Sequence, residues 1–416
     1  MTESQIRHYK NSVCPFCGLL CDDIDIVSAD GKLNAVSVNC PIAKALYHES
    51  LNLPEKPAEI RGRRVTHTDA IREAAQLIRK SKSPIVAGLQ TDVAGARSAL
   101  ALADRIGAVI ADEHSRSHHL VSGRLQTYGG FLTTLTEVKN RADLIIFLGD
   151  KLLSQFPRLL EWIELGTNSE FGFISDRNFA WIGKCSSNDS ARFEEPPLLL
   201  QCELDQVGQI TSVLRASLEP RRNVVPSPEL FPRKSMNRLV NLIRDAQYSV
   251  LLWSTEDFNF SLGDLAVDAI FRLIDSINRE RRCAGMPLSN SCATTTVNQV
   301  ATWQCGKPLP LNFRSGSPEF HPTQYAYDSI LERNDADLVI WVGGLERTVP
   351  AFGTSAELIR ISTKNPGHSD VFIPVGVPGI HHSTHLFRTD SVVSLYQKAL
   401  TPVSYTHLTL PTKRIV

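Results

Sequence analysis

The sequence predicts an α/β fold in which a small N-terminal β module is followed by two Rossmann-like α/β domains. The prediction depends on three observations: short continuous apolar runs of strand length, amphipathic stretches between them, and four cysteines within the first 40 residues. Two of the apolar runs, ADLIIFLG from Ala142 and ADLVIWVG from Ala336, match closely, with five of eight residues identical. This internal similarity indicates that the α/β architecture is duplicated.

The composition is that of an ordinary globular protein. The chain has 416 residues, 42% hydrophobic and 21% charged, which suits two to three domains. Lysine plus arginine equal aspartate plus glutamate at 44 each, so we expect neither nucleic acid nor a membrane surface as a partner. No apolar run approaches the roughly 18 to 20 residues that span a bilayer, and the polar start lacks a secretory core, so we expect a cytoplasmic protein.

The N-terminal module is predicted over residues 1–60 and contains the cysteines of VCPFCGLLCDD and VNCPIAK. Cys14, Cys17, Cys21 and Cys40 have the spacing C-x2-C-x3-C-x18-C, and four thiolates complete a tetrahedral metal site or a cubane cluster. The gap of three residues is less usual for structural zinc, and a proline follows two of the cysteines, as in turns around iron–sulfur clusters. We therefore favour a 4Fe-4S cluster, with zinc or an empty site as the alternatives.

Short strands are expected between these ligands, at Asp25 to Val27 and at Leu33 to Val38, joined by a turn at Asp30-Gly31. Lys44 follows the last cysteine by four residues and could reach a cofactor beside the cluster. A solvated lysine on a helix is an equal alternative for Lys44.

Continuous apolar runs with glycine at or near the end are typical of strands buried on both faces of a parallel sheet. Four segments have this character: Pro84 to Leu89, Ala142 to Gly149, Tyr248 to Ser254, and Ala336 to Gly343. Helices are predicted between the members of each pair, at GARSALALADRIGA and at Ser261 to Ile277. We therefore predict domains over 61–218 and 235–403, joined by a proline-rich linker at 219–234.

Ligands of parallel sheets bind beyond the carboxyl ends of the strands, where a glycine lets backbone amides approach a phosphate. Gly149 with Asp150, and Gly343 with Gly344, are therefore candidate contacts to a dinucleotide. A plain turn at the strand end is the alternative. No G-x-G-x-x-G motif opens a helix, which argues against an ordinary nicotinamide site.

Several motifs in a fixed order resemble the B subunit of formylmethanofuran dehydrogenase and its bacterial counterpart in the formyltransferase/hydrolase complex. They are CPFCGLLCDD, LTTLTEVKNRADLIIFLGD, TWQCGKP, NFRSGSPEFHP and IPVGVPGI, and the similarity runs from about Val13 to about Leu400. The resemblance implies a fold like that of molybdopterin oxidoreductases, in which the α/β domains hold molybdopterin or tungstopterin guanine dinucleotides. It also implies an amidohydrolase-like A subunit, a C subunit, and a D subunit that supplies the closing lobe as partners.

One departure from the family pattern concerns the metal ligand. In redox-active members, a cysteine or selenocysteine followed by His-Gly ligates molybdenum or tungsten, and the corresponding residue here is Ser117. His118 matches the family histidine, and His119 replaces the glycine. A hydroxyl is harder than a thiol and has a far higher pKa, which disfavours a working metal centre at Ser117. His118 is thus either a surviving active-site residue or part of a polar loop.

A second departure follows Arg314, which the resemblance makes a candidate catalytic residue. Ser315 and Glu319 stand where the family pattern has basic residues. A carboxylate there would repel formate or a carbamate.

These observations favour an iron–sulfur scaffold subunit of a complex that oxidises formyl groups to formate or CO2, with a degenerate metal site. The alternatives are an active subunit that interconverts CO2 and formylmethanofuran, and a zinc-stabilised assembly protein. The tail 404–416 does not continue the family pattern and is expected to be non-native read-through.

Overall fold

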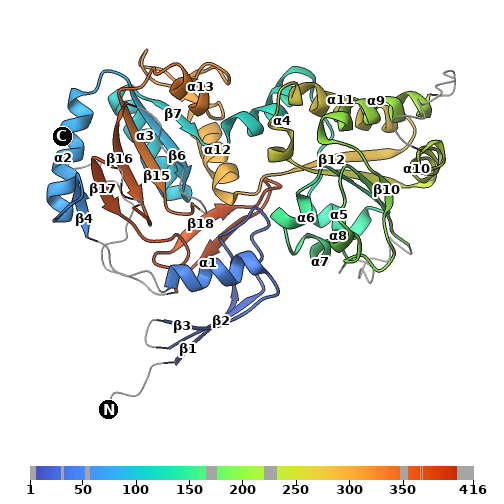
Figure 1. The fold of residues 1–416 in the computed structure, drawn as a ribbon, viewed down its shortest axis with the longest axis horizontal. Coiled ribbons are helices and arrows are strands. Elements are labelled where there is room, and N and C mark those ends of the chain that lie inside the picture. The colour runs from blue at the N-terminus through green and yellow to red at the C-terminus, as the bar shows by residue number, and fades with distance from the viewer. Residues whose placement is uncertain are drawn as a thin grey trace. The chain divides into compact units, whose positions relative to one another are not determined.

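The computed structural model describes residues 6–29, 32–51, 57–164, 176–219, 232–346, 355–365, 367 and 369–400. Two compact units make up the chain (Figure 1). Unit 1 comprises residues 1–116 and 291–416, and unit 2 comprises residues 117–290. Among the described residues, no helix is both long enough and apolar enough to cross a membrane.

Unit 1 is built on a nine-stranded sheet whose central strands are parallel. Its order is β14 (Glu319–Phe320), β13 (Leu311–Asn312), β7 (Val109–Asp112), β6 (Pro84–Gln90), β15 (Leu338–Gly343), β16 (Glu357–Ser362), β17 (Val371–Pro374), β4 (Ala58–Ile60) and β5 (Arg63–Val65). Strands β7, β6, β15, β16 and β17 are parallel, while β13 and β4 pair antiparallel with the two outer members. Every residue of β6 and β15 is buried, as their continuous apolar runs predict.

Helices cover both faces of this sheet. Apolar side chains of α2 (His67–Lys80), α3 (Val93–Ile106) and α12 (Cys292–Cys305) pack on one face. The other face packs against α13 (Tyr327–Glu332), around the fully buried Trp341.

The N-terminal part of unit 1 is a three-stranded antiparallel sheet of β1 (Ile6–Ser12), β2 (Ile24–Ala29) and β3 (Lys32–Ser37), followed by α1 (Pro41–Leu51). The predicted turn at Asp30-Gly31 lies outside the described residues. A hairpin of β18 (Thr384–Phe387) and β19 (Ser394–Gln397) completes the unit.

Unit 2 contains a five-stranded sheet in which all strands are parallel. Its order is β10 (Leu198–Leu200), β9 (Asn178–Ile182), β8 (Leu144–Leu148), β11 (Tyr248–Ser254) and β12 (Arg282–Leu288). One face packs against α9 (Val207–Leu218), α10 (Arg233–Asp245) and α11 (Gly263–Ile277), and on the other Phe147 stacks on Trp181 with ring centroids 5.2 Å apart. The remaining elements are α4 (Ser115–Tyr128), α5 (Leu135–Arg141), α6 (Leu152–Gln155), α7 (Leu159–Glu164), α8 (Ser187–Ser190), and the 3-10 helices η1 (Leu204–Gln206) and η2 (Thr255–Phe258).

The α/β class is confirmed, but the units do not follow the predicted division at 219–234. Strand β6 pairs with β15, and β8 pairs with β11, so each sheet takes strands from both sides of that segment. A parallel pair needs a long crossover connection, and here unit 2 is inserted between β7 and α12 of unit 1. Residues 220–231 of the predicted linker and the tail 404–416 lie outside the described residues.

Candidate functional site

Four buried cysteines gather in unit 1 around the loop that joins β1 to β2. Cys14, Cys17 and Cys21 lie in this loop and Cys40 lies directly before α1, and none of the four is more than 7% exposed. The backbone N–H of Cys14 donates to the carbonyl of Cys21 at 2.8 Å, which closes the loop on itself. Burial raises the pKa of the Cys14 thiol, and the other three thiol groups raise it further. All four residues predicted as ligands therefore lie buried in this loop or directly before α1.

Residues distant in the sequence fasten this cysteine loop. The thiol of Cys292, the first residue of α12, donates to the carbonyl of Pro15 at 3.0 Å. Gln397 Oε1 accepts from the N–H of Val13 at 2.7 Å, and the N–H of Thr389 donates to the carbonyl of Gly18 at 2.8 Å. Sequence spacing offered no reason to connect Cys292 with this loop, because the contact forms only when α12 folds against it.

The donor chemistry of the loop is that of four buried thiols. Thiolates are the ligands of structural zinc sites and of iron–sulfur clusters alike. Across the described ranges, no three or more His, Cys, Asp or Glu side chains are placed to hold one metal ion.

Lys44 is exposed on α1, and its N–H donates to the carbonyl of Cys40 at 3.0 Å. The backbone of Lys44 thus continues the turn after the last cysteine.

The carboxyl end of β8 in unit 2 is occupied by an internal carboxylate. Gly149 follows the strand with a φ of 103°, and the N–H groups of Asp150 and Lys151 both donate to Asp257 Oδ2, at 2.9 and 3.1 Å. The side chain of Asp150 accepts from the N–H of Lys184 at 2.8 Å. A phosphate at Gly149 and Asp150 would need the amides that Asp257 holds, so a dinucleotide does not fit this arrangement.

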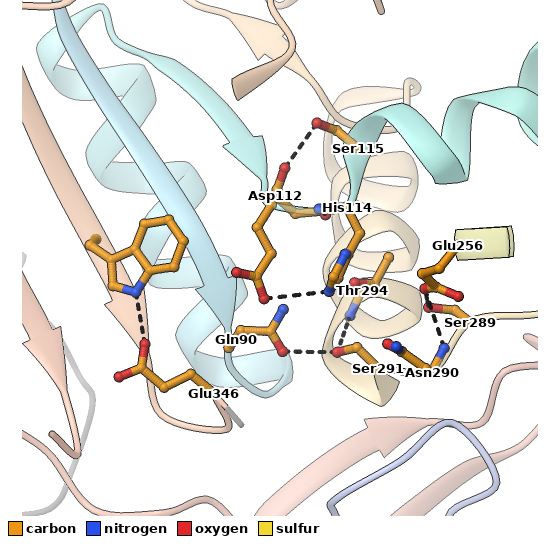
Figure 2. Close-up of polar contacts among 12 residues, drawn as sticks. Gln90, Asp112, His114, Ser115, Glu256, Ser289, Asn290, Ser291, Thr294 and Glu346 are labelled. Atoms are coloured by element: carbon orange, nitrogen blue, oxygen red, sulfur yellow. Dashed lines mark hydrogen bonds and ion pairs between the residues drawn. The ribbon is translucent and has the colours of Figure 1, made fainter. Parts of the chain in front are cut away.

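The equivalent end of β15 in unit 1 is also filled by an acidic side chain. Glu346 Oε2 accepts from Trp341 Nε1 at 2.9 Å (Figure 2). It also pairs with Arg360 at 3.2 Å, and both charged side chains are almost fully buried. A Cβ atom on Gly343 would lie 2.3 Å from Glu346 Oε2. The adjacent Gly344 lies against Pro378. The carboxylate therefore stands beside Gly343, where a phosphate contact was expected.

Other polar groups surround the carboxyl ends of β6 and β7. Gln90, the last residue of β6, accepts from Ser291 Oγ at 2.8 Å, and Ser291 caps α12 by accepting from the N–H of Thr294 at 3.3 Å (Figure 2). Asp112, the last residue of β7, accepts from Asn298 Nδ2 at 3.0 Å and from the N–H of His114. These bonds fix the loop that leads into α4.

Glu113, in that loop, has an unusual titration. Its pKa is raised to about 7, mainly by burial and also by the carboxylates of Asp112, Glu346 and Asp328, while His114 opposes the rise. Its side chain is 24% exposed, and His114 Nε2 lies 3.4 Å from Glu113 Oε1.

Ser117 and His118 lie in the first turn of α4. Ser117 is 2% exposed, whereas His118 is partly buried. Burial, together with the neighbouring His119, lowers the pKa of His118 to about 4. His118 is therefore neutral at pH 7.

Arg314 lies far from the strand ends named above. Its guanidinium donates to Ser83 Oγ at 2.9 Å, directly before the first residue of β6. The seven-residue strand β6 separates Ser83 from the carboxyl end of the sheet, a distance of about 20 Å at roughly 3.3 Å per residue. The structure therefore does not bring Arg314 to the ends of β6 and β15. It lines a surface pocket of about 320 Å³ together with Tyr325 and Arg333.

Sequence reasoning missed the acidic residues that fill the strand ends. Glu256 and Asp257 follow the end of β11 after one residue, Thr255, and Glu346 comes three residues after Gly343. The available signal was the pair of acids in STEDF, directly after a buried strand, where the approach of a phosphate would require glycine and backbone amides.

Comparisons with known proteins relate the chain to proteins of one-carbon metabolism. No protein-family model matches the sequence. The chain is 25% identical to the B subunit of tungsten-containing formylmethanofuran dehydrogenase 2 from Methanocaldococcus jannaschii, over 95% of both chains. It is 24% identical to the protein of the same name from Methanococcus maripaludis, over 92% of both chains.

A bacterial relative is equally similar. The chain is 25% identical to the B subunit of the formyltransferase/hydrolase complex of Methylorubrum extorquens, over 80% of this chain and 88% of that one. The crystal structure of that FhcABCD complex with methylofuran contains a chain of the same fold, with a TM-score of 0.73, 22% identity, and coverage of 84% of this chain and 95% of that one. The resemblance indicated by the sequence motifs is thus confirmed: the chain is similar to the B subunits of formylmethanofuran dehydrogenases and of the formyltransferase/hydrolase complex.

Proposed function

We propose that the chain is the B subunit of a complex that converts formyl groups to formate by transfer and hydrolysis, or to CO2 by oxidation, in methanofuran-linked and tetrahydromethanopterin-linked one-carbon metabolism. The observation that carries this proposal is the similarity over 95% of the chain to a B subunit of formylmethanofuran dehydrogenase. The shared fold with a chain of the FhcABCD complex supports it.

The proposed partners are an amidohydrolase-like A subunit, a C subunit and a D subunit. The bacterial relative carries the name of a complex with four lettered subunits, and this chain covers most of its length. In this proposal, formyl transfer and hydrolysis take place on the partners, because Ser117 stands where the resemblance places the metal ligand.

Within this complex, Cys14, Cys17, Cys21 and Cys40 would hold a 4Fe-4S cluster, which supplies one-electron storage or structural support when bound. Other residues of the chain hold the cysteine loop in place for the cluster. Cys292, Gln397 and Thr389 fix its backbone at three points. Burial excludes water from the thiols.

The pterin and metal site is proposed to be silent in this chain. Ser117 supplies a hydroxyl where a thiolate ligand is needed. His118 is neutral at pH 7 and so offers no positive charge to an anionic substrate. The carboxylates of Asp257 and Glu346 stand beside the two glycines at the strand ends, where they would repel phosphate groups of a dinucleotide.

A second candidate function is a working formylmethanofuran dehydrogenase that interconverts CO2 and formylmethanofuran. It is favoured by the names of the two archaeal relatives, both of which are called tungsten-containing. This function would require Ser117 to serve as a ligand, or the metal to be held without a protein thiolate.

Affinity purification of the tagged chain, coexpressed with A-type, C-type and D-type subunits, tests the proposal. We expect mass spectrometry to find the three partners in fixed ratios, and the purified complex to transfer or hydrolyse formyl groups. Purification of the tagged chain alone, with all partners soluble in the same lysate, would contradict the proposal. Copurification with polyferredoxin subunits, together with reduction of viologen by formylmethanofuran, would favour the second function.

A further inference from the structure

Two backbone amides at the end of β8 converge on one oxygen atom. The N–H groups of Asp150 and Lys151 donate to Asp257 Oδ2 at 2.9 and 3.1 Å. Successive amides that point at one position form a concave nest with affinity for anions. We call the amides of Asp150 and Lys151 the nest. The nest therefore has the geometry of an anion-binding site, and the anion that occupies it is the side chain of Asp257.

Asp257 is held in the nest at a cost. The residue is 5% exposed, and its second oxygen, Oδ1, is buried without a hydrogen-bond partner among the described residues. Leaving a buried carboxylate oxygen unsatisfied costs free energy, so the two amide bonds and the packing at Oδ2 must offset that loss. A side chain that only filled space at this position would be apolar and would not carry this cost.

The residues around the nest are shaped to admit this carboxylate. A Cβ atom on Gly149 would lie 2.5 Å from Asp257 Oδ2, so a larger residue at this position would push the carboxylate out. Gly149 donates its N–H to the carbonyl of Ile182 at 3.0 Å and accepts from Trp181 Nε1 at 2.8 Å, which fixes the backbone that presents the two amides.

The preceding residue, Glu256, acts in a similar way at the next strand. Its Oε1 atom accepts from the N–H of Asn290 and from Ser289 Oγ, both at 3.4 Å, just beyond the end of β12 (Figure 2). Two consecutive acids that follow β11 thus satisfy donors at the ends of the strands on either side of it.

We propose that Asp257 is an internal anion that occupies a phosphate-binding nest at the end of β8 and excludes phosphate esters from it. Removing the side chain should open the nest to pyrophosphate or to the diphosphate of a nucleoside diphosphate. All residues in this inference belong to unit 2. The inference goes beyond the proposed function, because it does not depend on which complex the chain belongs to.

Inorganic pyrophosphate, titrated into the purified full-length chain by isothermal titration calorimetry, tests the inference. We expect D257A to bind pyrophosphate at least tenfold more tightly than the unchanged chain. D257N keeps an oxygen in the nest without the charge and should bind no more tightly than the unchanged chain. D264A removes the same charge from an exposed position on α11 and serves as the matched control.

Amide hydrogen exchange gives a second measurement that does not need D257A to fold. The amides of Asp150 and Lys151 should be protected in the unchanged chain and in D257N. If D257A does not fold, D257S takes its place in the titration. The inference is overturned if these amides exchange as freely as a surface loop, if the unchanged chain binds pyrophosphate as tightly as the folded Ala or Ser variant, or if that variant does not bind it.

Discussion

Glu346 fills the space beside Gly343 at the end of β15, where a Cβ atom on Gly343 would lie 2.3 Å from Glu346 Oε2. The carboxylate cannot move away freely, because Trp341 donates to it and Arg360 pairs with it. We therefore expect Gly343→Ala to lower the free energy of unfolding by about 2 to 3 kcal/mol through overpacking. Chemical denaturation measures this change.

Gly344→Ala is the matched control for that variant. A Cβ atom on Gly344 would lie 3.3 Å from Pro378 Cδ, so a small shift relieves the contact. The loss should stay below about 1 kcal/mol. Equal losses for the two variants would show that Glu346 does not hold the position described here.

Arg360 depends on Glu346 for its counter-charge. The guanidinium is 0% exposed and the carboxylate is 1% exposed, at a separation of 3.2 Å. Glu346→Gln keeps the shape of the side chain but leaves a buried positive charge, which typically costs about 3 to 5 kcal/mol. Glu357→Gln breaks an exposed pair with Arg61 and should change the denaturation midpoint little. A stable E346Q variant would contradict the pairing.

Glu113 should make stability depend on pH near neutrality. Its pKa is raised from 4.5 to about 7 in the folded chain, which therefore binds the proton more tightly than the unfolded chain. The stability from this protonated group is fully present below pH 4.5 and is lost as the pH rises through about 7.

Glu113→Gln is neutral at every pH and removes this dependence. Relative to the unchanged chain, its free energy of unfolding should rise by on the order of 1 to 3 kcal/mol between about pH 4.5 and pH 8, after allowance for partial solvent access. Denaturation at a series of pH values gives the difference, and Asp104→Asn, at an exposed position on α3, is the control. A parallel pH profile for E113Q and the unchanged chain would rule out the raised pKa.

The cysteine loop should bind iron and sulfide in near-equal amounts when the protein is purified without oxygen. Cys17→Ser should remove both, because three thiolates do not complete the ligand set. Cys185→Ser changes a cysteine of unit 2 outside the loop and should leave both unchanged. Elemental analysis and the visible spectrum decide the question. Colourless protein with one zinc ion per chain would overturn the cluster assignment.

Much of the secondary structure could be predicted from the sequence. The segment Tyr248 to Ser254 becomes β11 with the predicted bounds, because a short continuous apolar run is typical of a strand that is buried on both faces of a parallel sheet. Helices α3 and α11 likewise lie at the predicted amphipathic stretches. A local sequence pattern is enough to predict a helix or strand that is formed by one continuous run of residues.

The grouping of strands could not be predicted in the same way. Nothing local states that β6 pairs with β15 rather than with the similar run of β8, because pairing depends on where crossover connections lead the chain. Arg314 shows the consequence for a candidate site. The resemblance suggested a catalytic role, but β13 places the residue at the amino end of β6, beside Ser83.

The contacts of Asp257 and Glu346 also depend on tertiary structure. Asp257 meets amides that lie more than 100 residues earlier, and the glycine beside each carboxylate is informative only once the space around it is known. The four cysteines could be predicted as a group because their spacing is itself the signal. Cys292 could not, because it joins the loop from α12.

We expect this chain to serve a formyl-processing complex without a working pterin-bound metal. Elemental analysis of the purified complex for molybdenum and tungsten tests this expectation most directly. The oxidation, transfer and hydrolysis of formyl groups are measured on the same sample. We predict negligible molybdenum and tungsten and no viologen-dependent oxidation of formylmethanofuran, while formyl transfer or hydrolysis persists. Near-stoichiometric molybdenum or tungsten, with viologen reduction that Ser117→Ala abolishes, would contradict this expectation.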